Sequence, residues 1–270
     1  MVQVAVGQFA PGQDKKANLH TVAELAGRAA ERGARVVLLP EYAMFTAPRT
    51  DHRCVEAAEP LDGPFLAAAA EVARKEGVHL VVGVNEAGAE DAERFTNTLV
   101  ALSPEGERIA LYRKIHLYDA FGVRESDVVS PGPLDEPQTF AVDGVVFGLQ
   151  TCYDLRFPEV TRRIADAGAH VVLLAAQWVP GPLKEEHWRT LLRARAIENT
   201  VYVAASGQSA PLGAGNSMVV DPMGTPVAAL GEQGFEVAVA DVSVARVEEV
   251  RVANPALSLR RFSVAPRSAG

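Results

Sequence analysis

Two short runs of this sequence are apolar at every position, "VVLL" at residues 36–39 and "VVLLAA" at residues 171–176. A strand with one face in water alternates apolar and polar residues, whereas a strand that is apolar throughout is suited to burial on both faces. Burial of both faces requires layers on either side of the sheet, and helices are the usual cover. The two runs therefore favour an α/β fold in which helices cover the sheets.

Strand patterns alternate with helical patterns along the chain, and Gly and Pro separate them. We expect strands at residues 2–9, 35–40, 78–84, 95–102, 107–114, 144–152, 170–176, 201–206, 217–221, 225–230 and 235–242. We expect helices at residues 17–33, 63–77, 158–167 and 184–199. The turn "SPEG" joins two of these strands as a hairpin, so the sheets are expected to be mixed rather than purely parallel.

The chain length of 270 residues is compatible with one large α/β domain. No linker, low-complexity tract or regular repeat interrupts the pattern, so residues 1–253 are predicted to form one domain. The tail, residues 254–270, has little core-forming pattern. Two interpretations are open for it, a disordered segment and an arm that packs on a partner.

The charge and the motifs exclude several classes of function. A formal charge of −8 gives no general attraction to nucleic acid or to anionic membranes, and no run of about 18 apolar residues is present. The N-terminus lacks a leader pattern, so a cytoplasmic location is expected. The two cysteines, Cys54 and Cys152, cannot build a disulfide framework and are expected to be reduced. No metal-ligand spacing and no nucleotide or flavin motif is found, so neither a metal nor a cofactor is predicted.

Three expected strands end at a reactive side chain. Glu41 follows "VVLLP", Lys114 ends "ALYRK", and Cys152 ends "FGLQTC". Sites in α/β proteins assemble at strand ends, because the adjoining loops converge there while the sheet holds them rigid. The three side chains are therefore expected to meet at one place.

These residue types together suit the hydrolysis of an amide or a nitrile. A thiol with an ordinary pKa of about 8.5 is mostly protonated at neutral pH and gains from a base, which Glu41 would supply. Lys114 and the backbone N–H of Tyr153 would stabilise the negative charge that develops on the attacked group. Each residue also has a plain structural interpretation: Cys152 as core filler, Glu41 as a loop cap and Lys114 as a solvated charge.

The flanking residues resemble a known family. "LLPEYAM", "YRKIHLYD" and "CYDLRFPE", in that order, resemble the three catalytic blocks of the nitrilase superfamily of carbon–nitrogen hydrolases. The resemblance extends over nearly the whole chain and is strongest to the amidase-like members, which include the omega-amidase and deaminated-glutathione amidase groups. It implies a four-layer α-β-β-α sandwich, a catalytic triad of Glu41, Lys114 and Cys152, no cofactor, and a homodimer or higher homo-oligomer.

The same resemblance gives roles to further residues. Glu125 in "RESD" corresponds to a second glutamate of many members, with a solvated surface charge as the alternative. Arg156 corresponds to a residue that holds a substrate carboxylate, with an ion pair to Asp154 or Glu159 as the alternative. Tyr42, Trp178 and Met218 are expected to line the acyl side of the site or to pack in the core. The helix at residues 184–199 is expected to bury Leu191, Leu192 and Ile197 and is a candidate dimer interface.

The predicted function is hydrolysis of a small linear amide, carrying a carboxylate, through a Cys152 thioester with release of ammonia. A nitrilase and an N-carbamoyl amide hydrolase would use the same triad on other substrates. A papain-like enzyme would need an oriented histidine, and no histidine occupies a recognisable block. A non-catalytic scaffold of the same fold is the alternative from a different class.

Overall fold

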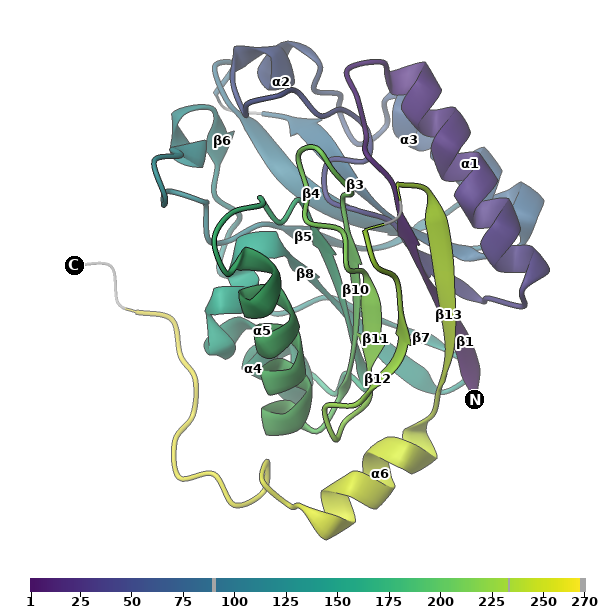
Figure 1. The fold of residues 1–270 in the computed structure, drawn as a ribbon, viewed down its shortest axis with the longest axis vertical. Coiled ribbons are helices and arrows are strands. Elements are labelled where there is room, and N and C mark those ends of the chain that lie inside the picture. Colours follow the sequence, from purple (N-terminus) through teal and green to yellow (C-terminus); the bar gives the residue numbers. More distant parts are fainter. Residues whose placement is uncertain (89–90, 233, 268–270) are drawn as a thin grey trace.

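Two β-sheets face each other at the centre of the molecule (Figure 1). The computed structural model of the chain describes residues 1–88, 91–232 and 234–267. The first sheet has the order β13-β1-β2-β3-β4-β5, with β6 beside β4. Its strands are β1 (Val2–Gln8), β2 (Val36–Leu38), β3 (His79–Ala87), β4 (Phe95–Leu102), β5 (Arg108–Arg113), β6 (Val129–Ser130) and β13 (Glu236–Val242).

The second sheet has the order β12-β11-β10-β9-β8-β7. Its strands are β7 (Thr139–Val142), β8 (Val145–Thr151), β9 (Val171–Ala176), β10 (Tyr202–Gly207), β11 (Met218–Val220) and β12 (Pro226–Ala229). In each sheet three neighbouring strands are parallel, β1-β2-β3 in the first and β8-β9-β10 in the second, and antiparallel strands flank them. Both sheets are therefore mixed, as the sequence predicts.

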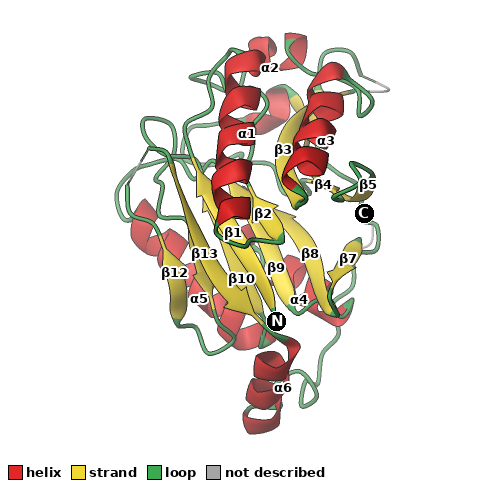
Figure 2. Cartoon of the chain, turned by 90° about the vertical axis from the view of Figure 1, so that its right-hand side faces the viewer, coloured by secondary structure: helices red, strands yellow, loops and turns green. Residues whose placement is uncertain are grey.

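Helices cover the outer face of each sheet, as the two views in Figures 1 and 2 show. The first sheet packs against α1 (Lys15–Glu31) and α3 (Pro64–Glu76), and the second against α4 (Pro158–Asp166) and α5 (Lys184–Asn199). The N-terminus of α1 is fixed by the side chain of Asp14, which accepts hydrogen bonds from the backbone N–H groups of Lys16 and Ala17. The predicted four-layer α-β-β-α sandwich is confirmed.

Strand β9 shows why the apolar runs require this architecture. Val171, Leu173 and Ala175 belong to the core between the two sheets, whereas Val172 and Leu174 pack toward α4 and α5. Successive side chains of a strand point to opposite faces, so only a strand between two apolar layers is apolar at each position. One strand therefore contributes side chains both to the core between the sheets and to the core under α4 and α5.

The strand directions bring several carboxyl ends to one edge of the molecule. β2 and β5 run in the same direction within the first sheet, since β3 is parallel to β2 and β4 is antiparallel to both β3 and β5. β8 and β9 are parallel in the second sheet. Gly83 on β3 helps here, because a Cβ at this position would lie 2.7 Å from the backbone nitrogen of Tyr42 and 2.8 Å from the Cα of Glu41. The segment after β2 can therefore cross β3 closely.

The sequence patterns do not predict six of the shorter elements. They are α2 (His52–Glu56), α6 (Val244–Ala253), β6, β7 and the 3-10 helices η1 (Glu125–Asp127) and η2 (Cys152–Arg156). The prediction for Ile197 is wrong: its side chain is 43% exposed, because it lies on the outer side of α5. After α6 the chain runs along the surface, where Arg260 pairs with Asp166 and Phe262 is 90% exposed. Among the residues that the structure describes, no helix is both long and apolar enough to cross a membrane.

Candidate active site

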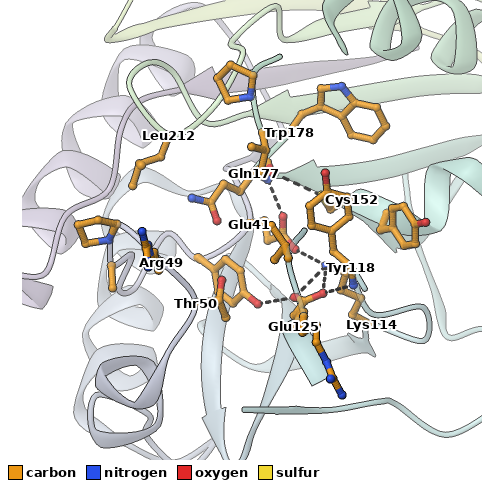
Figure 3. A pocket seen from close by; sticks show the side chains of 18 of the residues that line it. Glu41, Arg49, Thr50, Lys114, Tyr118, Glu125, Cys152, Gln177, Trp178 and Leu212 are labelled. Atoms are coloured by element: carbon orange, nitrogen blue, oxygen red, sulfur yellow. Dashed lines mark hydrogen bonds and ion pairs between the residues drawn. The ribbon is translucent and has the colours of Figure 1, made fainter. Parts of the chain in front are cut away.

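The three predicted side chains lie together at the shared edge of the two sheets (Figure 3). Glu41 follows β2, Lys114 follows β5 and Cys152 follows β8. The Nζ atom of Lys114 lies 3.1 Å from Oε1 of Glu41. All three line one cavity of about 570 Å³. The sheets thus bring together residues that are separated by 38 to 111 positions along the chain.

Cys152 stands at a sharp turn between a strand and a short helix. It is the first residue of η2, directly after β8, and its φ of 44° is in the left-handed region, which a non-glycine residue rarely adopts. The side chain is 7% exposed, and its thiol donates a hydrogen bond to the backbone oxygen of Gln177 at 3.6 Å. Burial and the Glu41 carboxylate raise the pKa of the Cys152 thiol well above its ordinary value. The sulfur is therefore a protonated thiol in the resting protein.

Glu41 is held on both of its carboxylate oxygens. Oε2 accepts a hydrogen bond from the backbone N–H of Gln177 at 2.5 Å, and Oε1 accepts one from the side-chain amide of Asn97 at 2.7 Å. Gln177 follows β9. Its backbone N–H donates to Glu41, and its backbone carbonyl accepts from the neighbouring Cys152. This contact between the two sheets places the carboxylate of one beside the thiol of the other.

Lys114 and Glu125 form a buried ion pair with Glu41. The ammonium group of Lys114 lies 2.9 Å and 2.8 Å from the two oxygens of Glu125, and its side chain is 2% exposed. Burial alone would lower the pKa of Lys114, but the carboxylates of Glu125 and Glu41 outweigh it and hold this pKa well above its usual value. Burial would likewise raise the pKa of Glu125, and Lys114 more than offsets it, so this pKa lies below its usual value. Lys114 and Glu125 are therefore both charged at neutral pH.

Further hydrogen bonds fix Glu125 on the floor of the cavity. The hydroxyl of Tyr42 donates to Oε1 at 2.7 Å and the backbone N–H of Tyr118 donates to Oε2 at 2.6 Å. A solvated surface charge, the alternative for Glu125, is excluded because the residue is buried and paired. Glu125 belongs to the same cluster as Lys114 and Glu41.

The turn at Cys152 is anchored from behind. Asp154, fully buried on η2, accepts a hydrogen bond from the hydroxyl of Tyr112 at 2.7 Å and contacts the ring and the backbone N–H of His116. Arg195 on α5 donates to the backbone oxygen of Leu155 at 3.0 Å and 2.7 Å. Since η2 is tied to other elements at both Asp154 and Leu155, the left-handed conformation of Cys152 is held in place.

The family model for carbon-nitrogen hydrolases matches residues 3–252 of the chain. The chain is a carbon–nitrogen hydrolase. It is 39% identical over 266 residues to a hydrolase of Mycobacterium tuberculosis, a match that covers 93% of this chain and 92% of that one. It is 38% identical over 263 residues to the deaminated glutathione amidase of Escherichia coli, which covers 96% of this chain and 97% of the amidase.

Solved structures of the same superfamily agree with this assignment. The NitFhit protein of C. elegans superposes with a TM-score of 0.86 at 31% identity, over 96% of this chain and 65% of that longer chain. An amidase from Nesterenkonia sp. AN1 superposes with a TM-score of 0.81 at 28% identity, over 96% of this chain and 94% of the amidase. In one mutant of that amidase, the acetamide moiety of fluoroacetamide is covalently added to the active-site cysteine. This hydrolase thus shares its fold with nitrilase-superfamily amidases.

The remaining predicted residues of this hydrolase separate into two groups. Tyr42, Trp178 and Arg156 line the cavity, whereas Met218 does not and packs in the core beneath α5. The alternative for Arg156 is wrong: within the described residues it forms no ion pair with Asp154 or Glu159, and Asp154 bonds Tyr112 and His116 instead. The guanidinium of Arg156 lies 4.9 Å from the ring centroid of Trp178.

Several residues of the site are absent from the sequence-based prediction, among them Gln177, Asn97 and Lys184. Gln177 stands at the end of β9, so the rule used for the other three strand ends would have identified it. Asn97 lies within β4, and Lys184 begins α5. A polar residue inside a strand and a lysine in a first helical turn are both ordinary surface features, and only the folded chain shows that Asn97 bonds Glu41 and that Lys184 lines the cavity.

Proposed function

We propose that this hydrolase cleaves the amide bond of a small linear amide that carries a carboxylate, through a thioester on Cys152 and with release of ammonia. The observation that supports this most strongly is the backbone of Gln177, whose N–H donates to the Glu41 carboxylate and whose carbonyl accepts from the Cys152 thiol. A thiol needs a base to become nucleophilic, and here the base is a carboxylate rather than the histidine of a papain-like enzyme.

In the first step, Sγ of Cys152 attacks the carbonyl carbon while the thiol proton moves to Glu41. The electron pair of the carbonyl bond moves onto oxygen and gives a tetrahedral oxyanion. Glu41 then gives its proton to the amide nitrogen, the carbon–nitrogen bond breaks, and ammonia leaves. The acyl group stays on Cys152 as a thioester.

In the second step, water attacks the thioester while Glu41 takes one of its protons. The second tetrahedral intermediate collapses, the carbon–sulfur bond breaks, and the proton on Glu41 returns to sulfur. The carboxylic acid leaves and the free thiol is restored. One amide and one water molecule thus become one acid and one ammonia.

The charged cluster around Glu41 supports this chemistry. In this proposal the Lys114 ammonium and the backbone N–H of Tyr153, the second residue of η2, stabilise the oxyanion. Glu125 holds the ammonium in place through two hydrogen bonds. Because these groups are oriented before substrate arrives, little reorganisation is needed during the reaction.

The substrate class follows from the cavity lining. Arg156, without an acidic partner in the described part of the chain, is suited to a substrate carboxylate, since its planar fork matches the two oxygens. Trp178 and Tyr42 provide apolar surface for the acyl chain. The relatives named deaminated glutathione amidase make amides of dicarboxylic acids the first compounds to assay.

Three further features belong to the same proposal. The reaction needs neither metal nor cofactor, because Cys152, Glu41 and Lys114 supply nucleophile, base and charge stabilisation; activity is therefore expected to survive dialysis against a chelator.

A cytoplasmic location is supported by two free thiols, Cys54 and Cys152. A homodimer is supported by the exposed apolar side chains of the tail, and light scattering would measure its mass.

The experiment that tests the function is a screen for ammonia release. Monoamides of four- and five-carbon dicarboxylic acids are compared with the neutral amides, the nitriles and the N-carbamoyl amines of matched length. The proposal predicts the highest kcat/KM for the acid amides. Faster ammonia release from the nitriles would identify a nitrilase, carbon dioxide release would identify a carbamoyl hydrolase, and no turnover of any compound would favour a scaffold.

A further inference from the structure

Two cationic side chains share one aromatic wall of the cavity. The ammonium of Lys184 lies 4.3 Å from the ring centroid of Phe121, 5.0 Å from that of Tyr118 and 5.3 Å from that of Trp178. The guanidinium of Arg156 lies 4.9 Å from the Trp178 centroid and 5.8 Å from the Phe121 centroid. Both cations therefore approach the same two rings, on a part of the cavity that also contains Cys152.

Neither cation has an acidic partner among residues 1–88, 91–232 and 234–267. The Lys184 ammonium donates to the hydroxyl of Tyr118 at 3.0 Å, and Arg156 contacts Nδ1 of His187 at 3.4 Å. The Nε atom of Arg156 is buried with no hydrogen-bond partner in the structure. Lys184 is 6% exposed. A buried cation without an anion is unfavourable, and aromatic faces compensate for only part of the lost hydration.

The two cations also act on each other. Burial, together with the neighbouring charge of Arg156, lowers the pKa of Lys184 below its ordinary value. The chain as a whole is acidic, with a formal charge of −8, so the absence of a carboxylate at this place does not reflect a shortage of acidic residues. The arrangement is that of an anion-binding site whose anion comes from outside the chain.

We propose that Lys184 and Arg156 form a single carboxylate subsite, in which Lys184 is a specificity-determining residue for the acyl part of the substrate. This inference rests on the proposed function, since release of ammonia leaves every carboxylate of the substrate in the acyl part. The guanidinium binds both oxygens of the carboxylate side by side, and the ammonium binds one of their remaining lone pairs as a point charge. The ring of Trp178, which is 3% exposed, forms one wall of the subsite, and Phe121, which is 70% exposed, lies on its solvent side.

The first test compares Lys184→Met and Lys184→Arg with the unchanged enzyme on the monoamide of glutaric acid and on pentanamide, its neutral counterpart. Lys184→Met keeps the length of the side chain but removes the charge. We expect it to raise KM for the acid amide about 10- to 100-fold, the scale of one charge-assisted hydrogen bond, with kcat and the pentanamide reaction little changed. Lys184→Arg is expected to restore most of the lost affinity.

A matched control is Lys75→Met, which removes a lysine whose side chain is 81% exposed on α3, away from the cavity. It should leave both reactions unchanged. The subsite is overturned if Lys184→Met leaves KM for the acid amide unchanged. It is also overturned if both substrates lose activity equally together with a lower melting temperature, because Lys184 then serves the fold.

A binding measurement separates this inference from the proposed function. In the Cys152→Ala background, calorimetry with glutarate is expected to show binding that weakens about 10- to 100-fold on adding Lys184→Met. If glutarate binds in this Lys184-dependent manner while the intact enzyme hydrolyses no amide, the subsite stands and the proposed function falls. If the intact enzyme hydrolyses the acid amide but glutarate affinity does not depend on Lys184, the subsite falls and the function stands.

Discussion

The cavity of this hydrolase contains two buried lysines in opposite electrostatic situations. Lys114, in the catalytic half, lies against the carboxylates of Glu41 and Glu125 at 2.8 to 3.1 Å. Lys184, in the recognition half, has no carboxylate beside it in the described part of the chain and faces aromatic rings and Arg156. The two halves occupy the same cavity, yet only the lysine of the catalytic half is paired with carboxylates.

This difference indicates what each half is for. The catalytic half pairs its cation with carboxylates of the protein, because its groups must be oriented before substrate arrives. The recognition half leaves its positive charge uncompensated, so a bound carboxylate removes an unfavourable interaction as well as making new contacts. Variants in the catalytic half should therefore affect every substrate, and variants in the recognition half only the charged ones.

Removal of the nucleophile should have the largest effect. Cys152→Ala is expected to lower kcat on the order of 10⁶-fold for acid and neutral amides alike, because no thioester can form. Cys54→Ala, which changes the other buried thiol, is the matched control and should retain activity. Ammonia release and thermal unfolding are measured for both. Near-native turnover by Cys152→Ala would remove Cys152 from the mechanism.

The two lysines themselves offer the next test. Lys114→Met leaves two buried carboxylates without their cation and should lower the free energy of unfolding by about 3–5 kcal/mol. Lys184→Met removes a cation that has no anion, so the free energy of unfolding should stay the same or rise. Urea denaturation of the substrate-free proteins measures both. Equal destabilisation by the two changes would show that the halves do not differ as described.

Asn97 tests how the catalytic half is oriented. Its amide donates to Oε1 of Glu41 at 2.7 Å, so Asn97→Ala leaves this oxygen with the Lys114 ammonium as its remaining partner. We expect kcat to fall about 10²-fold for acid and neutral amides, with KM unchanged, because a small misplacement of a reacting group has this cost. A change in KM for the acid amide alone would instead assign Asn97 to recognition.

The pH dependence of stability tests the state of Cys152. Its pKa in the folded protein is raised by burial and by Glu41, whereas the unfolded chain has the ordinary thiol pKa of about 8.5. Between these two values only the unfolded chain loses the proton, so the free energy of unfolding should fall by up to about 1.4 kcal/mol per pH unit. The Cys152→Ser protein lacks this contribution. Parallel stability curves for the two proteins from pH 8 to 10 would contradict the raised pKa.

Arg156→Lys should have the smallest effect. The change keeps the charge of the recognition half but removes the planar fork, so KM for an acid amide is expected to rise about tenfold or less. Turnover of the neutral amide should barely change. Steady-state kinetics on both substrates decides, and a lower melting temperature with loss of both activities would indicate a structural role for Arg156.

The sequence predicts most of the catalytic half but only part of the recognition half, where it predicts Arg156 and Trp178 but not Lys184. Glu41, Lys114 and Cys152 each follow a strand, and strand direction alone brings them to one edge. Lys184 begins a helix, where a lysine is ordinarily solvated, and its burial depends on the conformation of the loop before α5, which contains Trp178, and of the segment that contains Phe121. Loop conformation is not encoded in a periodic pattern, so the position of Lys184 could not be predicted.

The same contrast holds for the fold. Long strands and amphipathic helices follow from periodicity, whereas α2, β6, β7 and η2 are too short to show a period. Ile197 illustrates a further limit: the helical pattern predicts that it lies on a buried surface, and in the structure it is exposed on α5. An exposed isoleucine needs no explanation within the chain, and it leaves the face available for contact with another protomer.

Acylation of Cys152 is tested most directly by partitioning the acyl group between water and hydroxylamine. The monoamide and the monomethyl ester of glutaric acid would give the same thioester, so water and hydroxylamine should divide it in the same ratio whichever substrate is supplied. If Cys152 is acylated, we expect equal ratios of acid to hydroxamate from both substrates at each hydroxylamine concentration, and no hydroxamate from the Cys152→Ala protein. Ratios that depend on the leaving group, or hydroxamate formed without Cys152, would contradict it.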